Sequence, residues 1–297
     1  MRLDMSRDAA HDQSKGDRSA TWRIVRNLIA QGDGRVPTLR ALLVAAHPDD
    51  ETIGAAGLLS RLPRCELLYL TDGAPRDLRW APAARGSRDE YAEARRREAA
   101  AALSLVGLAD HSLISLGAVD QEAAFAMPVL ARHLADRFHR FGADLVLTHA
   151  YEGGHPDHDA AAFIVHAAAE LLRRRGASPP LLVEMTSYHA RGGAFVAGEF
   201  LPLGGLDGQA LLNLTPKERG LKRRMLECFE TQKEFLVQFP LPEVECYRPA
   251  PAYRFTEPPH AGPLLYETRG FPLAGGHWRE LARQALRDLD LPEDEPF

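Results

Sequence analysis

The segment ALLVAAHPDDETIG, Ala41–Gly54, decides the fold of this chain. Its first part, Ala41–Ala46, is a short and continuous apolar run, which is typical of a strand buried on both faces of a parallel sheet. A polar loop follows at once, and the small apolar residues of Ile53–Leu62 then predict a helix that packs closely on the sheet. A buried strand, a polar loop and a helix in this order indicate the first unit of an α/β fold.

The same alternation continues along the chain. Further strands are predicted at Glu66–Thr71, His111–Leu116, Asp144–Thr148 and Leu181–Ser187. Helices are predicted between them at Tyr91–Leu108, Gln121–Phe141 and Ala160–Arg175. Strands and helices at this spacing predict a Rossmann-like, doubly wound and mainly parallel sheet flanked by helices. In such sheets the ligand binds beyond the carboxyl ends of the strands.

The C-terminal part of the chain has a different pattern. The sequence TPKE at residues 215–218 is a capping box with proline at the first helical position, so it predicts a helix that runs to about Phe239. Proline-rich sequence follows, and His277–Leu289 predicts a last helix. These elements follow the strand and helix alternation but do not continue it.

The chain divides into three predicted parts. Residues 1–20 are polar and lack periodicity, so we expect a disordered tail. Residues 21–240 carry the strand and helix alternation and are expected to form a single domain, since no long linker interrupts them. Residues 241–297 are expected to be a C-terminal extension that packs on the same domain.

The composition excludes several classes of function. The 297 residues include 36 Lys and Arg against 41 Asp and Glu, and a net charge of −5 argues against a nucleic-acid partner. The 3 Cys are scattered, so neither a disulfide framework nor a Cys-based zinc site is expected. No apolar run approaches the ~20 residues of a membrane span, and we see no secretory signal. A cytoplasmic location is expected, and the oligomeric state is left open.

Two polar loops follow equivalent strands of the predicted sheet. The first, HPDDE at residues 47–51, comes directly after the first strand, and the second, GGHPDHD at residues 153–159, comes after the fourth. A catalytic zinc ion typically takes three protein ligands from His and carboxylate side chains and leaves one position for water. Two loops that combine His and Asp at the same edge of a sheet therefore predict one shared metal site.

The neighbouring acids Asp49 and Asp50 are suited to two different tasks. Their side chains diverge, so one can bind the metal while the other accepts a proton from a water whose pKa the metal lowers toward ~7. The alternative is that Asp-Asp-Glu-Thr only caps the following helix, because acidic residues are favoured at helix N-termini. The presence of two such loops favours the metal site.

The two loops together resemble a known enzyme family. AHPDDE after a first strand and GGHPDHDA after a later one are similar to the motifs of the LmbE-like, or PIG-L, de-N-acetylases. Supporting similarity lies in Thr71-Asp72-Gly73, in Arg95–Glu98 and in the late helix from Lys222 through Gln232. The resemblance implies a zinc-dependent amidohydrolase that removes the N-acetyl group from an N-acetylglucosamine-type amino sugar or its conjugate.

The resemblance also implies the residues of the metal site. The metal ligands would be His47, Asp50 and His158, and Asp49 would be the general base. The cofactor would be one Zn²⁺ per chain, with another divalent ion possible in its place.

Further roles are implied for residues around this site. His155 would stabilise the oxyanion or protonate the leaving amine, and we expect Asp157 or Asp159 to hold its imidazole protonated. Asp157 would also orient a histidine, as acids beside metal sites do. Arg95 would contact a sugar hydroxyl, although the Arg95-Arg96-Arg97 run fits a solvated helix face equally well.

The alternative function is a noncatalytic Rossmann-like protein that binds a sugar or a nucleotide. A dinucleotide-binding loop would carry G-x-G-x-x-G after the first strand, whereas this loop carries acids where a pyrophosphate would sit. The complete set of His and Asp residues also argues against a decayed catalytic site. We therefore expect an enzyme whose partner is a small N-acetylated sugar or glycoconjugate.

Overall fold

The computed structural model describes residues 19–30, 39–108, 113–202 and 208–297. Residues 1–18 of the predicted tail lie outside the described residues, and residues 19–30 are helical. Among the described helices, none has the length and apolar character needed to cross a membrane.

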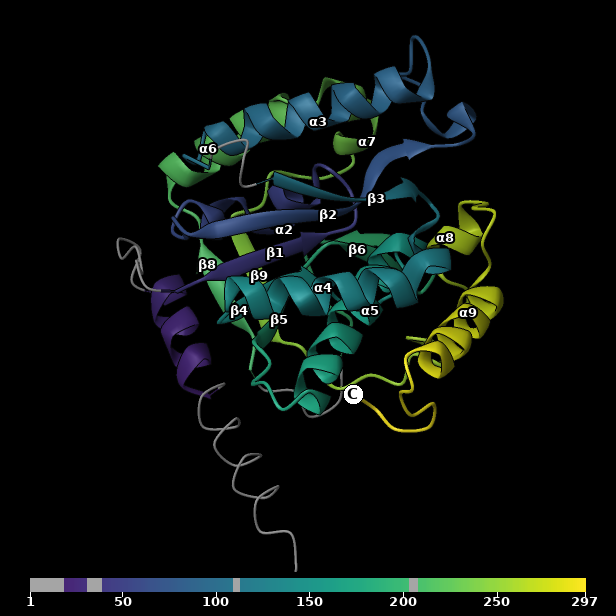
Figure 1. Ribbon diagram of the computed structural model, residues 1–297. Coiled ribbons are helices and arrows are strands. Elements are labelled where there is room, and N and C mark those ends of the chain that lie inside the picture. The colour runs from purple at the N-terminus through teal and green to yellow at the C-terminus, as the bar shows by residue number, and fades with distance from the viewer. Residues whose placement is uncertain (1–18, 31–38, 109–112, 203–207) are drawn as a thin grey trace, which may run out of the picture.

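A seven-stranded sheet forms the centre of the described structure (Figure 1). Its strands, in spatial order, are β3 (Leu113–Asp120), β2 (Cys65–Pro75), β1 (Ala41–Ala45), β4 (Leu145–His149), β5 (Leu181–Met185), β9 (Val244–Pro249) and β8 (Ala210–Asn213). The first five are mutually parallel, whereas β9 is antiparallel to both β5 and β8. The predicted α/β fold with a mainly parallel sheet is therefore confirmed.

Helices cover both faces of this sheet. Ala41, Leu43 and Ala45 of β1 belong to the core on one face, and Leu42 and Val44 to the core on the other, because alternate side chains of a strand point to opposite faces. The first core packs on the helix over 19–30 and on α2 (Asp50–Leu59), α3 (Arg88–Ser104) and α6 (Pro216–Glu227). The second packs on α4 (Met127–Phe141), α5 (Pro156–Arg174) and α9 (Gly275–Asp288), as Figure 1 shows.

One predicted helix is wrong in its length. The helix expected from residue 215 to about Phe239 begins with the predicted capping box but ends at Glu227. A 3₁₀ turn, η4 (Glu230–Gln232), and the short α7 (Lys233–Leu236) follow it. The chain leaves the helical path because Thr231 and Gln232 bind α3 instead: the Thr231 N–H donates to Glu98 at 2.9 Å, and the Gln232 amide donates to the Tyr91 hydroxyl at 2.7 Å.

The helix predicted over Gln121–Phe141 begins later than expected. Gln121 has a φ of 71°, which a helix does not allow, and a 3₁₀ turn, η3 (Ala123–Ala126), precedes α4. The sequence patterns also do not predict β8, β9 or the hairpin of β6 (Tyr188–Arg191) and β7 (Ala194–Ala197).

The predicted C-terminal extension contributes to the same layers. β9 lies between β5 and β8 in the sheet, and the Trp278 indole of α9 donates to the Pro156 carbonyl of α5 at 3.0 Å. The division of the chain at residue 240 stays a prediction.

Candidate active site

The two polar loops meet at the carboxyl edge of the sheet. β1 and β4 are neighbours at the point where the strand order reverses, and the loops that follow them lead into α2 and α5. A cavity of about 530 Å³ opens there, and His47, Asp49, Asp50 and His155 line it. The topology therefore brings together loops that are more than a hundred residues apart in the sequence.

The three predicted metal ligands meet at the Asp50 carboxylate. Its Oδ2 lies 3.3 Å from His47 Nδ1, and its Oδ1 lies 3.1 Å from His158 Nε2. All three side chains are buried, and His158 Nε2 faces Asp50 Oδ1 without a well-directed hydrogen bond to any described residue. A buried imidazole nitrogen in this state requires a partner, and two imidazoles with one carboxylate fit a divalent cation.

The charge states of Asp50 and His158 suit a cation. Burial lowers the pKa of His158 to about 3, so its imidazole is neutral, which is the form that binds a metal. Burial raises the pKa of Asp50, but the rings of His158 and His149 facing its oxygens hold that pKa well below the ordinary value. Asp50 and His158 therefore combine an ionised carboxylate with a neutral imidazole. Burial lowers the pKa of His47, but Asp120, Asp157 and Asp50 around its ring raise that pKa well above the ordinary value, so His47 has to release a proton when a metal binds.

His149 also reaches this cluster. Its Nε2 lies 3.3 Å from Asp50 Oδ2 and accepts a hydrogen bond from the Ala46 N–H at 3.1 Å. Its ring stacks on that of His158, with centroids 4.0 Å apart. Because the Nε2 lone pair accepts this backbone N–H, His149 in this tautomer packs on His158 and does not donate to Asp50. Three groups bring potential ligand atoms within 4.8 Å of one another: His47, His155 and His158; Asp50, His149 and His158; His47, Asp120 and Asp157.

Asp49 has an unusual backbone conformation. Its φ of 129° is rare for any residue with a side chain, and its carbonyl accepts the first hydrogen bonds of α2 from Thr52 and Ile53. Its side chain, however, makes no capping hydrogen bond. It faces Arg95 instead, with 3.2 Å between Asp49 Oδ2 and Arg95 Nη2. The helix-cap alternative therefore does not account for Asp49, and strained backbone of this kind is characteristic of functional positions.

The electrostatics of Asp49 suit a proton acceptor. Burial raises the pKa of its carboxyl well above the ordinary value, and the neighbouring Arg95 opposes that rise. A carboxylate whose pKa is moved toward neutrality is a better general base than an ordinary surface acid.

Arg95 is the one buried arginine of the Arg95-Arg96-Arg97 run, with 4% of its surface exposed. The two arginines after it pair with Glu93 on the exposed side of α3. The Arg95 guanidinium donates to the carbonyl oxygens of Gly73 and Pro48 as well as to Asp49. These contacts position Asp49 and its loop, and a contact from Arg95 to a sugar hydroxyl stays a prediction.

Asp157 contacts a predicted metal ligand. Its Oδ2 lies 3.2 Å from His47 Nε2, on the opposite side of the ring from the Nδ1 that faces Asp50. Two backbone N–H groups, those of Gln121 and Ala123, donate to the same carboxylate at 2.6 and 3.0 Å. The structure thus holds Asp157 where it can fix the orientation and tautomer of His47.

The expectation that Asp157 or Asp159 holds His155 protonated is wrong. The Asp157 carboxylate faces His47, and Asp159 accepts backbone hydrogen bonds from Glu152 and Gly153. The His155 Nδ1 accepts a hydrogen bond from the Asp157 N–H at 3.1 Å, which places the ring hydrogen on Nε2. Burial, together with the neighbouring His47 and His158 rings, lowers the pKa of His155 well below its ordinary value. His155 is therefore a neutral hydrogen-bond donor.

Asp120 is a site residue that the sequence analysis does not single out. It ends β3, lines the cavity, and places Oδ1 3.0 Å from His47 Nε2. The sequence signal that identifies Asp120 is its position after a strand, because acids at the carboxyl ends of parallel strands lie at one edge of the sheet. The predicted strand stopped at Leu116, four residues before the observed end, so Asp120 fell in a presumed loop.

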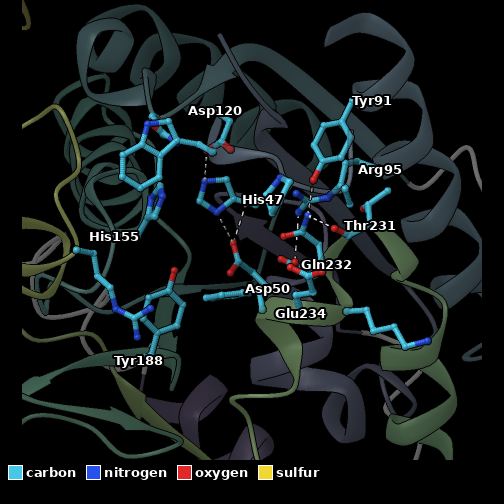
Figure 2. A pocket seen from close by; sticks show the side chains of 18 of the residues that line it. His47, Asp50, Tyr91, Arg95, Asp120, His155, Tyr188, Thr231, Gln232 and Glu234 are labelled. Carbon is cyan, nitrogen blue, oxygen red and sulfur yellow. Dashed lines mark hydrogen bonds and ion pairs between the residues drawn. The ribbon is translucent and has the colours of Figure 1, made fainter. Parts of the chain in front are cut away.

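Figure 2 shows two unlike sides of the cavity. His155 and Tyr188 lie on one side of His47 and Asp50. The other side carries polar side chains from α3 and from the η4–α7 segment: Tyr91, Arg95, Thr231, Gln232 and Glu234. The break after α6, which the sequence did not predict, is what brings this polar group to the cavity.

Comparisons with known proteins agree with the motifs. Residues 42–169 match the PIG-L family model, described as GlcNAc-PI de-N-acetylase, and this range contains both polar loops. The resemblance predicted from the sequence is confirmed by this match. No curated protein sequence shows significant similarity to the chain.

Solved structures share the fold. A deacetylase from the biosynthesis pathway of teicoplanin has a TM-score of 0.54 and 19% identity, covering 71% of this chain and 97% of that chain. The A40926 pseudoaglycone deacetylase Dbv21 gives 0.53 and 19%, covering 71% and 96%. A zinc-inhibited form of the teicoplanin deacetylase Orf2 gives 0.52 and 17%, covering 71% and 97%. At these identities the three structures establish the architecture alone.

Proposed function

We propose that this chain, whose residues 42–169 match the PIG-L family, is a metal-dependent hydrolase that removes the N-acetyl group from an N-acetylglucosamine-type amino sugar or its conjugate. One observation carries the proposal. The buried His47–Asp50–His158 cluster, in which two imidazoles face one carboxylate, lies beside the strained Asp49 at the edge of one cavity. A metal site next to a separate buried carboxylate supplies a Lewis acid and a general base, and the two together support amide hydrolysis.

His47, Asp50 and His158 would hold the metal. A zinc ion bound there supplies a Lewis acid for the amide carbonyl and favours ionisation of water at neutral pH. Asp157 orients His47 through its Nε2, which leaves the Nδ1 directed toward Asp50. The same donors also accept other divalent ions, so the identity of the native metal is part of the proposal to be tested.

Asp49 acts as the proton acceptor in this proposal. It takes a proton from the water whose oxygen forms the new bond to the amide carbon. When the C–N bond breaks, the leaving amine needs a proton, and Asp49 is the group that has just gained one. Arg95 keeps the Asp49 carboxylate ionised and oriented before the reaction.

His155 supports the developing negative charge. Its Nε2 carries the hydrogen, and the ring lines the cavity beside His47, with ring centroids 4.5 Å apart. A neutral donor fixed in this way can stabilise the oxyanion of the tetrahedral intermediate. Of the two roles implied by the resemblance, the geometry favours oxyanion stabilisation over protonation of the amine.

The cavity supports a sugar as the substrate. The hydroxyl, amide and guanidinium groups of Tyr91, Gln232 and Arg95 form a polar side that suits the hydroxyls of an amino sugar. Two of the structures with the same architecture are deacetylases of the teicoplanin pathway and of the A40926 pseudoaglycone. We propose a small N-acetylated sugar or glycoconjugate as the partner, and a cytoplasmic location remains a prediction.

Metal analysis and acetate release test the proposal together. Protein purified without chelator should contain about one divalent ion per chain and release acetate from at least one N-acetylated amino sugar. His47→Ala and His158→Ala should lose both the metal and the activity, whereas zinc binding as tight as in the parent would overturn the ligand set. Folded, metal-loaded protein that releases no acetate from any such sugar would favour the noncatalytic binding alternative. Zinc should be titrated to one equivalent and beyond, because a deacetylase of the same architecture has a zinc-inhibited form.

A further inference from the structure

Aromatic side chains from separate segments form a continuous row along one side of the cavity. Trp80 ends the 3₁₀ turn η1 (Leu78–Trp80), and Phe271 follows the short helix α8 (Leu265–Thr268). The Trp80 and Phe271 ring centroids are 4.8 Å apart at an interplanar angle of 37°. The Phe271 ring in turn meets the edge of His155, with centroids 4.8 Å apart. We call Trp80 and Phe271 the aromatic platform, which therefore starts at the catalytic His155 and extends away from it.

The platform remains open to a ligand. Both rings line the cavity, and Trp80 is 38% exposed although it is a large apolar side chain. The proposed deacetylation chemistry uses neither ring, since neither reaches the predicted metal ligands through any contact in the described structure. Covering exposed aromatic surface is favourable, so a ligand that extends over both rings gains affinity.

The surroundings of Trp80 favour a flat apolar group over a second sugar. Pro82 and Ala83, which continue the cavity lining after Trp80, carry no side-chain hydrogen-bonding group. Arg85 lines the same region, and its Nη1 donates to the backbone carbonyls of Pro82 and Ala84. Apart from the remaining N–H groups of Arg85, the hydroxyls of a second sugar would find few partners beside Trp80, whereas an aromatic ring stacks well on such a surface.

The location of the platform indicates which part of the substrate contacts it. The polar side formed by Tyr91 and Gln232 lies across His47 and Asp50 from His155, as Figure 2 shows. With the amide beside His155 and the sugar hydroxyls toward the polar side, the group to which the sugar is attached extends along the aromatic side. We propose that the aromatic platform binds an aromatic ring in that group, so that the substrate is an aryl conjugate of N-acetylglucosamine. This inference rests on the proposed function and specifies its substrate class.

The experiment compares 4-nitrophenyl N-acetyl-β-D-glucosaminide with the methyl glycoside and with N,N′-diacetylchitobiose. We expect kcat/KM for acetate release to be roughly tenfold higher for the aryl glycoside, the size expected for one stacking contact. Trp80→Ala should reduce that preference to about one and leave kcat on the methyl glycoside unchanged. Phe125→Ala removes another exposed aromatic ring, one outside the cavity lining, and should keep the preference.

A binding measurement separates this inference from the proposed function. The nitrophenyl group should quench the fluorescence of Trp80 in metal-free protein, where no turnover occurs, and Trp80→Phe should lose the quenching while it keeps part of the kinetic preference. Acetate release without preference for the aryl glycoside, or an equal preference for the disaccharide, would overturn the platform and leave the deacetylase standing. Quenching at Trp80 without acetate release from any substrate would overturn the deacetylase and leave the platform standing.

Discussion

Replacing Arg95 by glutamine should move the pH dependence of the reaction in a defined direction. Arg95 opposes the burial that raises the pKa of Asp49, so its removal raises that pKa further. A general base must be ionised to act, and the acid limb of the kcat/KM profile should therefore move to higher pH. Glutamine is the suitable replacement because its amide can keep one hydrogen bond to the Gly73 or Pro48 carbonyl.

The size of this shift follows from the geometry. Two unit charges 3.2 Å apart, the distance between Arg95 Nη2 and Asp49 Oδ2, attract by about 5 kcal/mol at an effective dielectric constant of ~20, which bounds the shift at roughly four pKa units. Relaxation of the site reduces such effects to about one to three units, which is the expected movement of the acid limb. Activity should fall much more at pH 6 than at pH 9.

The assay is a pH series of kcat/KM from acetate release, with metal content measured at each pH. Arg97→Gln is the matched control, because Arg97 lies on the exposed side of the same helix and pairs with Glu93. Its profile should coincide with that of the parent. An acid limb that stays in place or moves to lower pH in Arg95→Gln would refute the pairing of Arg95 with a catalytic Asp49.

Three further outcomes are expected. Asp157→Asn should weaken metal binding about 10- to 100-fold in a chelator competition, since its carboxylate faces His47 Nε2; unchanged affinity would remove its orienting role. Asp50→Asn should lose the metal, whereas Asp49→Asn should keep it and lower kcat by roughly 10²–10⁴; equal metal loss in both would contradict the division of roles. Burial lowers the pKa of His166 from 6.5 to about 4, so stability is present above pH 6.5 and is lost as the pH falls toward 4. From pH 7.5 to pH 5, urea unfolding should show the parent losing about 2 kcal/mol more than His166→Gln, and equal losses would show that His166 does not titrate in this way.

The sequence was sufficient to predict the mainly parallel sheet and the two polar loops at its carboxyl edge. β1 is fully buried, so its apolar run is continuous, and the loops of residues 47–51 and 153–159 carry their chemistry within a few positions. Topology then follows, because parallel strands place their carboxyl ends at one edge. These features are local in sequence or follow from strand alternation, which is why they could be predicted.

Features that depend on distant partners could not be predicted in this way. Glu245 and Arg248 place charges inside β9, and a strand with buried charges resembles a loop in sequence. Their partners are far away: Lys222 donates to Glu245 at 2.9 Å, and Arg248 donates to Glu184 at 2.7 Å. Only the folded chain shows that these charges are compensated.

The α2 helix is a second feature that depends on a distant partner. Its backbone leaves the helical conformation at Ala55, where φ is −144° and ψ is 15°. The freed N–H groups of Gly57 and Leu58 are bound by Glu245, more than 180 residues away along the chain. Glu245 thus holds the helix that begins directly after Asp49, and no local pattern in the sequence reveals it.

Some residues of the site also could not be predicted from local sequence patterns. Asp120 and the aromatic platform come from segments between the motifs, and their roles depend on where β3, η1 and the chain after α8 end. The same applies to His155, whose charge state depends on which backbone N–H group meets its Nδ1. The spacing of His155 and Asp157 indicated an ion pair, whereas the folded loop forms a backbone hydrogen bond.

The most direct test of the central claim is the stoichiometry of products from an N-acetylglucosamine conjugate. Protein reloaded with one equivalent of metal should release acetate and free amine in equal amounts, and chelator-treated protein should release neither until metal is restored. Asp49→Asn with the same metal content should be slower by at least roughly 10². Equal rates for this variant and the parent, or product release that continues without metal, would contradict a hydrolase in which His47, Asp50 and His158 hold the metal and Asp49 accepts the proton.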